Sequence, residues 1–167
     1  AVQAAPVFMD KEKTIEKGCS LMAEAAGKGA RLIVFPETWV PAFPYWGQQP
    51  GRRWIKVWRD MLYNAVEIPS ADTDILCHAA HKANAYVAIG VNERDKRSLG
   101  TMYNTILFID NHGNIMGKHR KLVPWEAERL YWGRGDGSDL KVYDTELGRL
   151  GGLICGEHYM TLSKYTL

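Results

Sequence analysis

Three short segments of the sequence each end in a residue that can do chemistry. The run Arg-Leu-Ile-Val-Phe-Pro-Glu ends at Glu37, Gly-Lys-His-Arg-Lys ends at Lys121, and Leu-Gly-Gly-Leu-Ile-Cys ends at Cys155. Each run is apolar or alternating, which predicts a strand. Ligands of open α/β folds lie beyond the carboxyl ends of strands. We therefore expect these side chains to meet there as a general base, a cationic stabiliser and a nucleophile.

Cys155 is the best candidate nucleophile. It follows an apolar run and precedes a predicted helix that starts near Glu157. A thiol at a helix N-terminus has a lowered pKa, and the two preceding glycines let a substrate approach closely. Its position alone also fits a buried, inert cysteine. The other two cysteines, Cys19 and Cys77, fall in helical patterns as core residues, and three scattered cysteines suit a reducing cytoplasm.

Lys121 is the candidate cation. If residues 115–121 form a regular strand, Lys121 shares a face with Ile115 and His119, while Lys118 and Arg120 point the other way. An inward lysine at a strand end is rare and usually paired or functional. The alternative is a basic edge strand that discourages aggregation.

The remaining polar candidates could instead have structural or solvent-exposed roles. Glu37 and Glu128 could each be solvated, and Glu37 could instead cap a helix. Glu157 and His158 follow Cys155 and could orient it. The Cys155-x-x-His158 spacing has no second pair at zinc spacing, so we expect neither a metal nor a cofactor.

The order of predicted elements indicates a single α/β domain with a mixed sheet. Residues 36–50 are rich in proline and tryptophan, which favours either a rigid pocket wall or a packed surface loop. The predicted helices cover residues 10–26, 54–65 and 72–83, with another from 157. The predicted strands cover residues 1–5, 31–35, 86–91, 101–109, 115–121, 140–143 and 150–155.

Composition excludes several functional classes. Among 167 residues, 46% are hydrophobic and 24% are charged, and the net charge is only +2. That charge is too small to indicate nucleic acid or an anionic membrane as a partner. No apolar stretch reaches the length that would cross a bilayer, and no signal peptide is evident. We expect a cytoplasmic protein.

Three segments resemble the signature segments of the nitrilase family of carbon–nitrogen hydrolases. They are residues 35–39 (Phe-Pro-Glu-Thr-Trp), 119–124 (His-Arg-Lys-Leu-Val-Pro) and 155–158 (Cys-Gly-Glu-His). Further matches follow in order along nearly the whole chain. Residues 35–46 resemble true nitrilases more than the amidase branches.

The resemblance implies a nitrilase-like α-β-β-α sandwich, here truncated, so that 1–167 is one domain incomplete at its C-terminus. It implies that the enzyme converts a nitrile to a carboxylic acid and ammonia through thioimidate and thioester intermediates, without a cofactor. It also implies a homo-oligomer, either a dimer or a spiral. The catalytic residues would be Glu37 as base, Lys121 as stabiliser, Cys155 as nucleophile and Glu128 as a supporting carboxylate. The expected substrate-binding residues are Trp39, Tyr45, Trp46, Trp125 and His158.

Two departures from the family pattern leave rival functions open. Gly156 stands where a tryptophan is usual, and Trp125 stands where a small polar residue is usual. The rivals are an amidase or carbamoylase of the same family, a non-catalytic assembly subunit on the same scaffold, and a cysteine enzyme that pairs Cys155 with His158 or His119.

Overall fold

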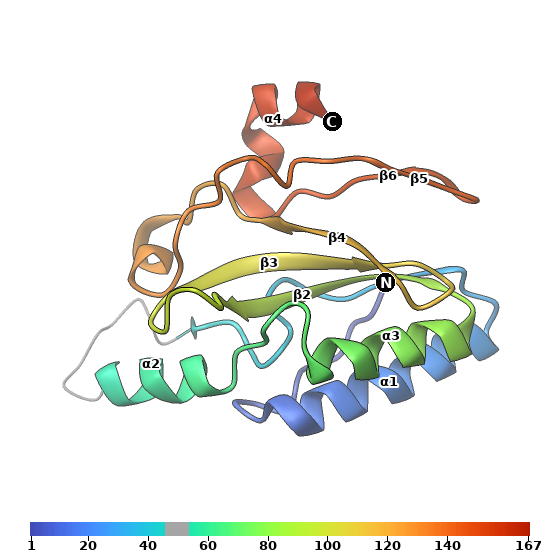
Figure 1. Ribbon diagram of the computed structural model, residues 1–167, viewed down its shortest axis with the longest axis horizontal. Helices are drawn as coiled ribbons and strands as arrows, with labels where there is room; N and C mark the ends of the chain where they lie inside the picture. Colours follow the sequence, from blue (N-terminus) through green and yellow to red (C-terminus); the bar gives the residue numbers. More distant parts are fainter. Residues whose placement is uncertain (46–53) are drawn as a thin grey trace.

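Helices cover one face of a mixed sheet, and a hairpin and a short helix lie over its other face (Figure 1). The computed structural model describes residues 1–45 and 54–167. Its helices are α1 (Lys11–Gly27), α2 (Trp54–Tyr63), α3 (Ala71–Ala83) and α4 (Thr161–Thr166), with 3₁₀ helices η2 (Glu126–Leu130) and η3 (Cys155–Tyr159). Its strands are β1 (Leu32–Val34), β2 (Tyr86–Arg94), β3 (Met102–Ile109), β4 (Ile115–Arg120), β5 (Tyr143–Thr145) and β6 (Gly148–Leu150).

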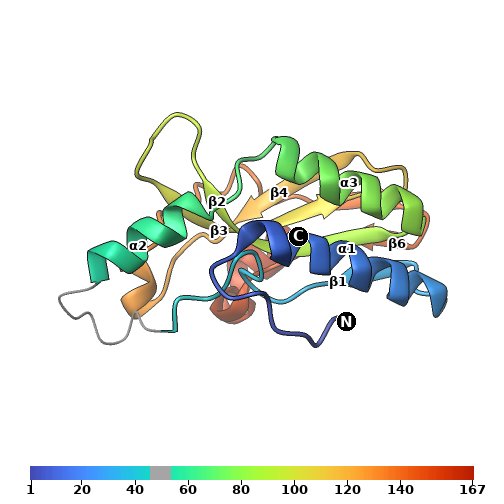
Figure 2. The same ribbon diagram turned by 90° about the horizontal axis from the view of Figure 1, so that it is seen from below.

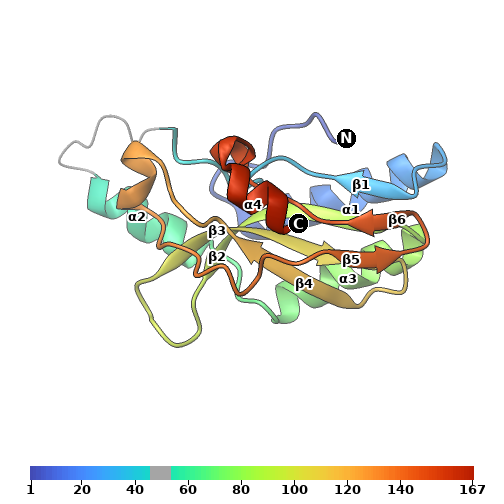
Figure 3. The ribbon, with the colours of Figure 1, turned by 90° about the horizontal axis from the view of Figure 1, so that it is seen from above.

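The main sheet has the order β1-β2-β3-β4, in which β1 is parallel to β2 and the other pairs are antiparallel. The β5–β6 hairpin forms the second sheet and lies over the first, where Tyr143 packs 5.4 Å from the Phe108 ring (Figure 3). With α4 outside the hairpin, the layers follow the expected α-β-β-α order.

Alternation along the strands separates a helix-covered face from a site-bearing face. Helices α1 and α3 lie side by side along one face of the sheet (Figure 2). Val87, Ile89 and Val91 of β2 pack with the apolar residues of these helices in the main core. α1 begins where the Asp10 carboxylate accepts a hydrogen bond from the Lys13 amide at 3.0 Å, which satisfies a free donor of the first turn. No helix in the described ranges is long and apolar enough to cross a bilayer.

Several predicted strands differ from the structure. Residues 1–5 are not a strand, although the Val2 amide donates to the Val34 carbonyl at 2.8 Å. β5 begins at Tyr143, where the strand predicted over 140–143 was expected to end. Only Leu150 of the strand predicted over 150–155 is in β6. The residues that follow cross the sheet face instead, since a side chain on Gly152 would meet the Phe108 ring at 2.9 Å.

A β-bulge in β4 corrects the predicted faces of that strand. Phe108 pairs with Gly117, but Ile109 pairs with Ile115, so Met116 is an extra residue. Ile115 therefore packs into the helix-side core. His119 and Lys121 lie on the opposite face, contrary to the prediction that they share a face with Ile115.

The chain that carries Glu37 crosses β2 at a point where only glycine fits. A Cβ on Gly90 would lie 2.2 Å from the Pro36 carbonyl oxygen and 2.5 Å from the Thr38 nitrogen, both backbone atoms that cannot rotate away.

We expect Gly90→Ala to lower the free energy of unfolding by about 2 kcal/mol or more, because overpacking against backbone forces the strands apart. Gly27→Ala is the matched control, since nothing lies within 4 Å of its added Cβ. In a helix that change stabilises by up to about 1 kcal/mol. Urea unfolding of both variants measures the difference, and equal stability would contradict the described crossing.

Candidate active site

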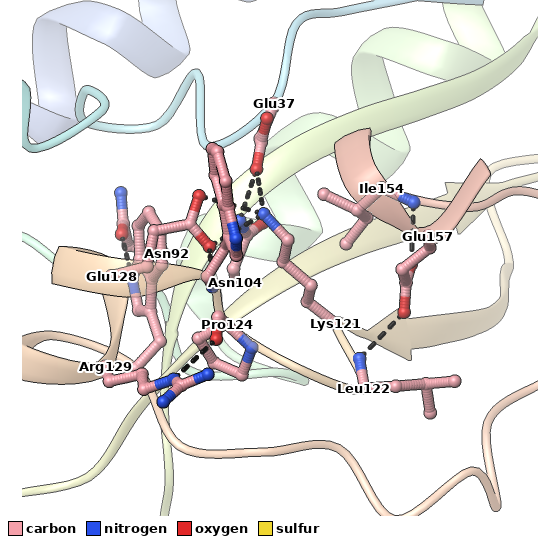
Figure 4. Close-up of polar contacts among 12 residues, drawn as sticks. Glu37, Asn92, Asn104, Lys121, Leu122, Pro124, Glu128, Arg129, Ile154 and Glu157 are labelled. Atoms are coloured by element: carbon pink, nitrogen blue, oxygen red, sulfur yellow. Dashed lines mark hydrogen bonds and ion pairs between the residues drawn. The ribbon is translucent and has the colours of Figure 1, made fainter. Parts of the chain in front are cut away.

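The ammonium group of Lys121 lies between two carboxylates on the site-bearing face (Figure 4). Its Nζ donates to Glu37 Oε1 at 2.9 Å and to Glu128 Oε1 and Oε2 at 3.0 and 2.8 Å. The Lys121 side chain is 2% exposed, against 25% for Glu37 and 12% for Glu128. The structure thus brings together three of the four predicted catalytic residues.

Two of these side chains follow a strand, and the third lies in a short 3₁₀ helix. Lys121 follows β4 directly, and its amide donates to the Asn104 carbonyl at 2.8 Å, which continues the sheet pairing by one residue. Glu37 lies beyond β1, where Thr38 takes a positive φ of 44°. Glu128 lies in η2 and accepts the Trp125 amide at 2.8 Å.

The two carboxylates decide the charge of Lys121. Burial alone would lower its pKa, but the hydrogen bonds from Lys121 to Glu128 and Glu37 outweigh burial, so the pKa is raised above its ordinary value. The amine is therefore protonated at neutral pH.

Two asparagines that we did not predict as site residues complete this arrangement. Asn104 Nδ2 donates to Glu37 Oε1 at 2.7 Å, which orients the carboxylate. Asn92 lies opposite Asn104 in the sheet, donates to the Val40 and Ala42 carbonyls and accepts from Trp132 Nε1. For Asn104 the available signal was an asparagine within a largely apolar predicted strand, where that residue type is depleted. Asn92 follows the predicted strand 86–91, so the sequence pattern carried no such signal for it.

Cys155 is exposed and adjoins both carboxylates through two cavities. A cavity of about 310 Å³ is lined by Cys155, Glu37 and His158. A second, of about 220 Å³, is lined by Cys155 and Glu128 together with aromatic side chains. Cys155 begins η3 with a φ of 50°, a left-handed conformation that costs a non-glycine residue about 1–3 kcal/mol. Such strain is concentrated at functional positions.

The helix expected just after Cys155 is not an α-helix. Residues Cys155–Tyr159 form a single 3₁₀ segment, and α4 starts only at Thr161. The predicted pKa effect of a regular helix N-terminus therefore has no structural basis. A side chain at Gly156 would meet no atom within 4 Å, so the position has room for a larger residue.

Three of the five predicted substrate-binding residues line the two cavities. Tyr45 and Trp125 line the aromatic cavity, and His158 lines the other one. Trp39 lines neither cavity; it is 2% exposed in the helix-side core, and its Nε1 donates to the Ala4 carbonyl at 2.7 Å. Trp46 lies outside the described residues.

The basic run around Lys121 is divided between the two faces of β4. Lys118 and Arg120 form ion pairs with buried Glu93 on the helix side, as the alternation predicted. His119 Nε2 lies 2.8 Å from Glu157 Oε2, so its described partner is a carboxylate rather than Cys155. In the residues that the structure describes, no group of three His, Cys, Asp or Glu side chains could hold a metal.

We expect iodoacetamide to modify Cys155 about tenfold faster than Cys19 or Cys77 at neutral pH. Cys155 is exposed, whereas the other two are partly covered and burial raises the pKa of both thiols. Mass spectrometry of the digested, alkylated protein measures the three rates. Equal modification would mean that the Cys155 sulfur is covered in solution.

The buried Lys121, its two partly buried glutamate partners and the exposed Cys155 lie on a chain that matches the model of the carbon–nitrogen hydrolase family. The chain belongs to this family, because the carbon–nitrogen hydrolase profile matches residues 1–167.

The chain is similar to proteins that are named nitrilases. The chain is 46% identical to Nitrilase 2 of an unknown prokaryotic organism, over 99% of the chain and 53% of that protein. It is 42% identical to a nitrilase of Bacillus sp. (strain OxB-1), over 98% of the chain and 47% of that protein. The chain therefore spans about half the length of these relatives.

The fold is that of the nitrilase superfamily. The crystal structure of Saccharomyces cerevisiae Nit3, a member of branch 10 of that superfamily, matches with a TM-score of 0.76. The match covers 99% of this chain and 59% of Nit3. At 22% identity, this similarity shows a shared fold and nothing about function.

Proposed function

We propose that the protein is a nitrilase that hydrolyses an organic nitrile to a carboxylic acid and ammonia, with Cys155 as its nucleophile. The observation that carries this proposal is the Lys121 ammonium, held by Glu37 and Glu128, next to cavities that also contain Cys155. The similarity to nitrilases supports the substrate class.

In the first half of the reaction, Glu37 accepts the thiol proton and the Cys155 sulfur attacks the nitrile carbon. The carbon–nitrogen triple bond becomes a double bond, and charge develops on nitrogen. The buried Lys121 ammonium stabilises that charge in a site of low dielectric, where such an interaction is strongest. Glu37 then passes the thiol proton to the nitrogen, which gives a neutral thioimidate and returns Glu37 to its carboxylate form.

In the second half, Glu37 deprotonates a water molecule, which adds to the thioimidate carbon and gives a tetrahedral intermediate. Glu37 gives the proton it took from water to the amine nitrogen. The hydroxyl group then loses its proton to the same nitrogen through Glu37, the carbon–nitrogen bond breaks, ammonia leaves, and a thioester remains. A second water hydrolyses the thioester to the acid and returns the thiol. Glu128 does not react in this scheme; it fixes the Lys121 amine and the backbone of η2.

We propose that the substrate side chain lies in the aromatic cavity lined by Phe43, Tyr45 and Trp125. Aromatic walls favour planar or extended apolar groups. We also propose that residues 1–167 belong to one hydrolase domain and that the protein forms a homo-oligomer.

Ammonia release from aliphatic, aryl and arylaliphatic nitriles and from their matching amides tests the function. We expect release from nitriles, strongest with an arylaliphatic side chain, and its loss after iodoacetamide treatment. Release from amides alone would assign an amidase instead. No release from folded protein with either class would favour a non-catalytic role.

A further inference from the structure

A buried histidine–glutamate pair lies beside the site and has no part in the chemistry proposed above. His119 Nε2 and Glu157 Oε2 are 2.8 Å apart, and their side chains are 2% and 0% exposed. Fully buried carboxylates are rare unless they have several partners. We therefore examine which groups the Glu157 carboxylate binds.

Glu157 joins the two segments that carry the reactive side chains (Figure 4). Its Oε1 accepts the amide of Leu122, the residue after Lys121, at 2.7 Å. Its Oε2 accepts the amide of Ile154, the residue before Cys155, at 2.6 Å. One carboxylate thus bridges the backbone beside the amine and the backbone beside the thiol.

The two segments differ in how firmly they are fixed at this point. Lys121 continues the pairing of β4 through the Asn104 carbonyl, whereas Cys155 opens a 3₁₀ segment after four residues without regular structure. The thiol therefore needs a connection to the sheet to keep a constant separation from the amine.

The chemistry of the donors requires a carboxylate at position 157. Two backbone amides converge on separate oxygens, and His119 Nε2 shares one of them. Burial alone would raise the pKa of Glu157, but the hydrogen bonds from His119 and the two amides outweigh it and lower the pKa. A glutamine has one acceptor oxygen, so its amino group would face a backbone N–H in either orientation.

We propose that Glu157 is a positioning residue that sets the placement of the Cys155 thiol relative to the Lys121 ammonium, and that His119 orients Glu157. The proposal rests on the nitrilase function above. A displacement of about 1 Å between reacting groups can reduce a rate by about 10²-fold. The pair therefore affects the chemical step without touching the substrate.

The test compares Glu157→Gln, His119→Leu and His119→Gln, with Glu12→Gln and His78→Gln as exposed controls on α1 and α3. We expect Glu157→Gln to lower kcat by about 10²-fold and to change KM by less than about threefold. We expect His119→Leu to lower kcat about tenfold, and His119→Gln, which keeps a donor near Nε2, to restore most of it.

Alkylation of Cys155 by iodoacetamide gives a readout that needs no turnover. Its rate at a fixed pH should change in Glu157→Gln, because the backbone at Ile154, next to Cys155, loses its hydrogen-bond acceptor. A residue that only stabilised the fold would lower the urea midpoint and leave kcat and this rate unchanged at low temperature.

Wild-type kcat with unchanged alkylation in folded Glu157→Gln would overturn the proposal. If Glu157→Gln does not fold, the two His119 variants decide: equal activity in both contradicts it. If His119→Leu is unfolded as well, the pair is required for folding and the positioning role is wrong. A wild-type protein that releases no ammonia would refute the nitrilase function instead, and the alkylation rates would still test the positioning.

Discussion

Replacing Lys121 with methionine is expected to reduce ammonia release from a nitrile by about 10³-fold, since it removes the only cation within the described cluster that faces the developing charge. Methionine keeps the length and apolar stem of lysine, so the main change is the loss of charge. The effect should appear in kcat rather than in KM, because the charge on nitrogen forms only during attack.

The same substitution should also destabilise the fold. Without the ammonium, the Glu37 and Glu128 carboxylates face each other with no partner for their charges, which costs about 3 kcal/mol. The double variant Lys121→Met/Glu128→Gln removes one of those charges. We expect it to regain most of the stability measured by urea unfolding and none of the activity. Recovery of activity in the double variant would show that Lys121 is structural only.

Cys155→Ala is expected to abolish turnover, with a loss of about 10⁴-fold or more, because no covalent intermediate can form. Cys155 is exposed, so the free energy of unfolding should stay within about 0.5 kcal/mol of wild type. Ammonia release with the preferred nitrile and urea unfolding measure the two quantities. Residual turnover above about 1% of wild type would assign the nucleophile to another group.

Cys155→Gly separates activity from strain at the same position. Glycine adopts a φ of 50° without the steric penalty that cysteine has there, so we expect this inactive variant to be about 1 kcal/mol more stable than wild type. Equal or lower stability would mean that the position is not strained. A gain would show that the reactive conformation is maintained against the local preference of the chain.

Alternation within one short strand made much of the site predictable. Because Lys118 and Arg120 occupy one face of β4, Lys121 had to occupy the other, and the structure confirms that separation. The apolar run before Glu37 likewise predicted β1 and the edge at which this carboxylate lies. Local periodicity is sufficient where neighbouring strands impose a regular pleat.

Periodicity failed where tertiary contacts decide the conformation. Trp39 lies in an aromatic segment of the kind that often lines pockets. In the structure, Gly18 of α1 leaves space for its ring in the core, where the ring also packs on Phe35. The run before Cys155 looks like a strand, yet its glycines let it cross over Phe108. Neither outcome can be predicted without knowing that Trp39 packs against α1 and that the segment before Cys155 lies over β3.

The extra residue Met116 gives β4 a tolerance to insertion and deletion that its neighbours lack. Because pairing from Gly117 onward is set by Phe108 and the residues before it, the catalytic end of the strand is independent of the hairpin end. A one-residue deletion at Met116 would restore a regular ladder and leave Lys121 in register. In related genes, length variation in this hairpin should therefore fall between Asp110 and Met116 and stop at Gly117, where Tyr143 leaves no space for a Cβ.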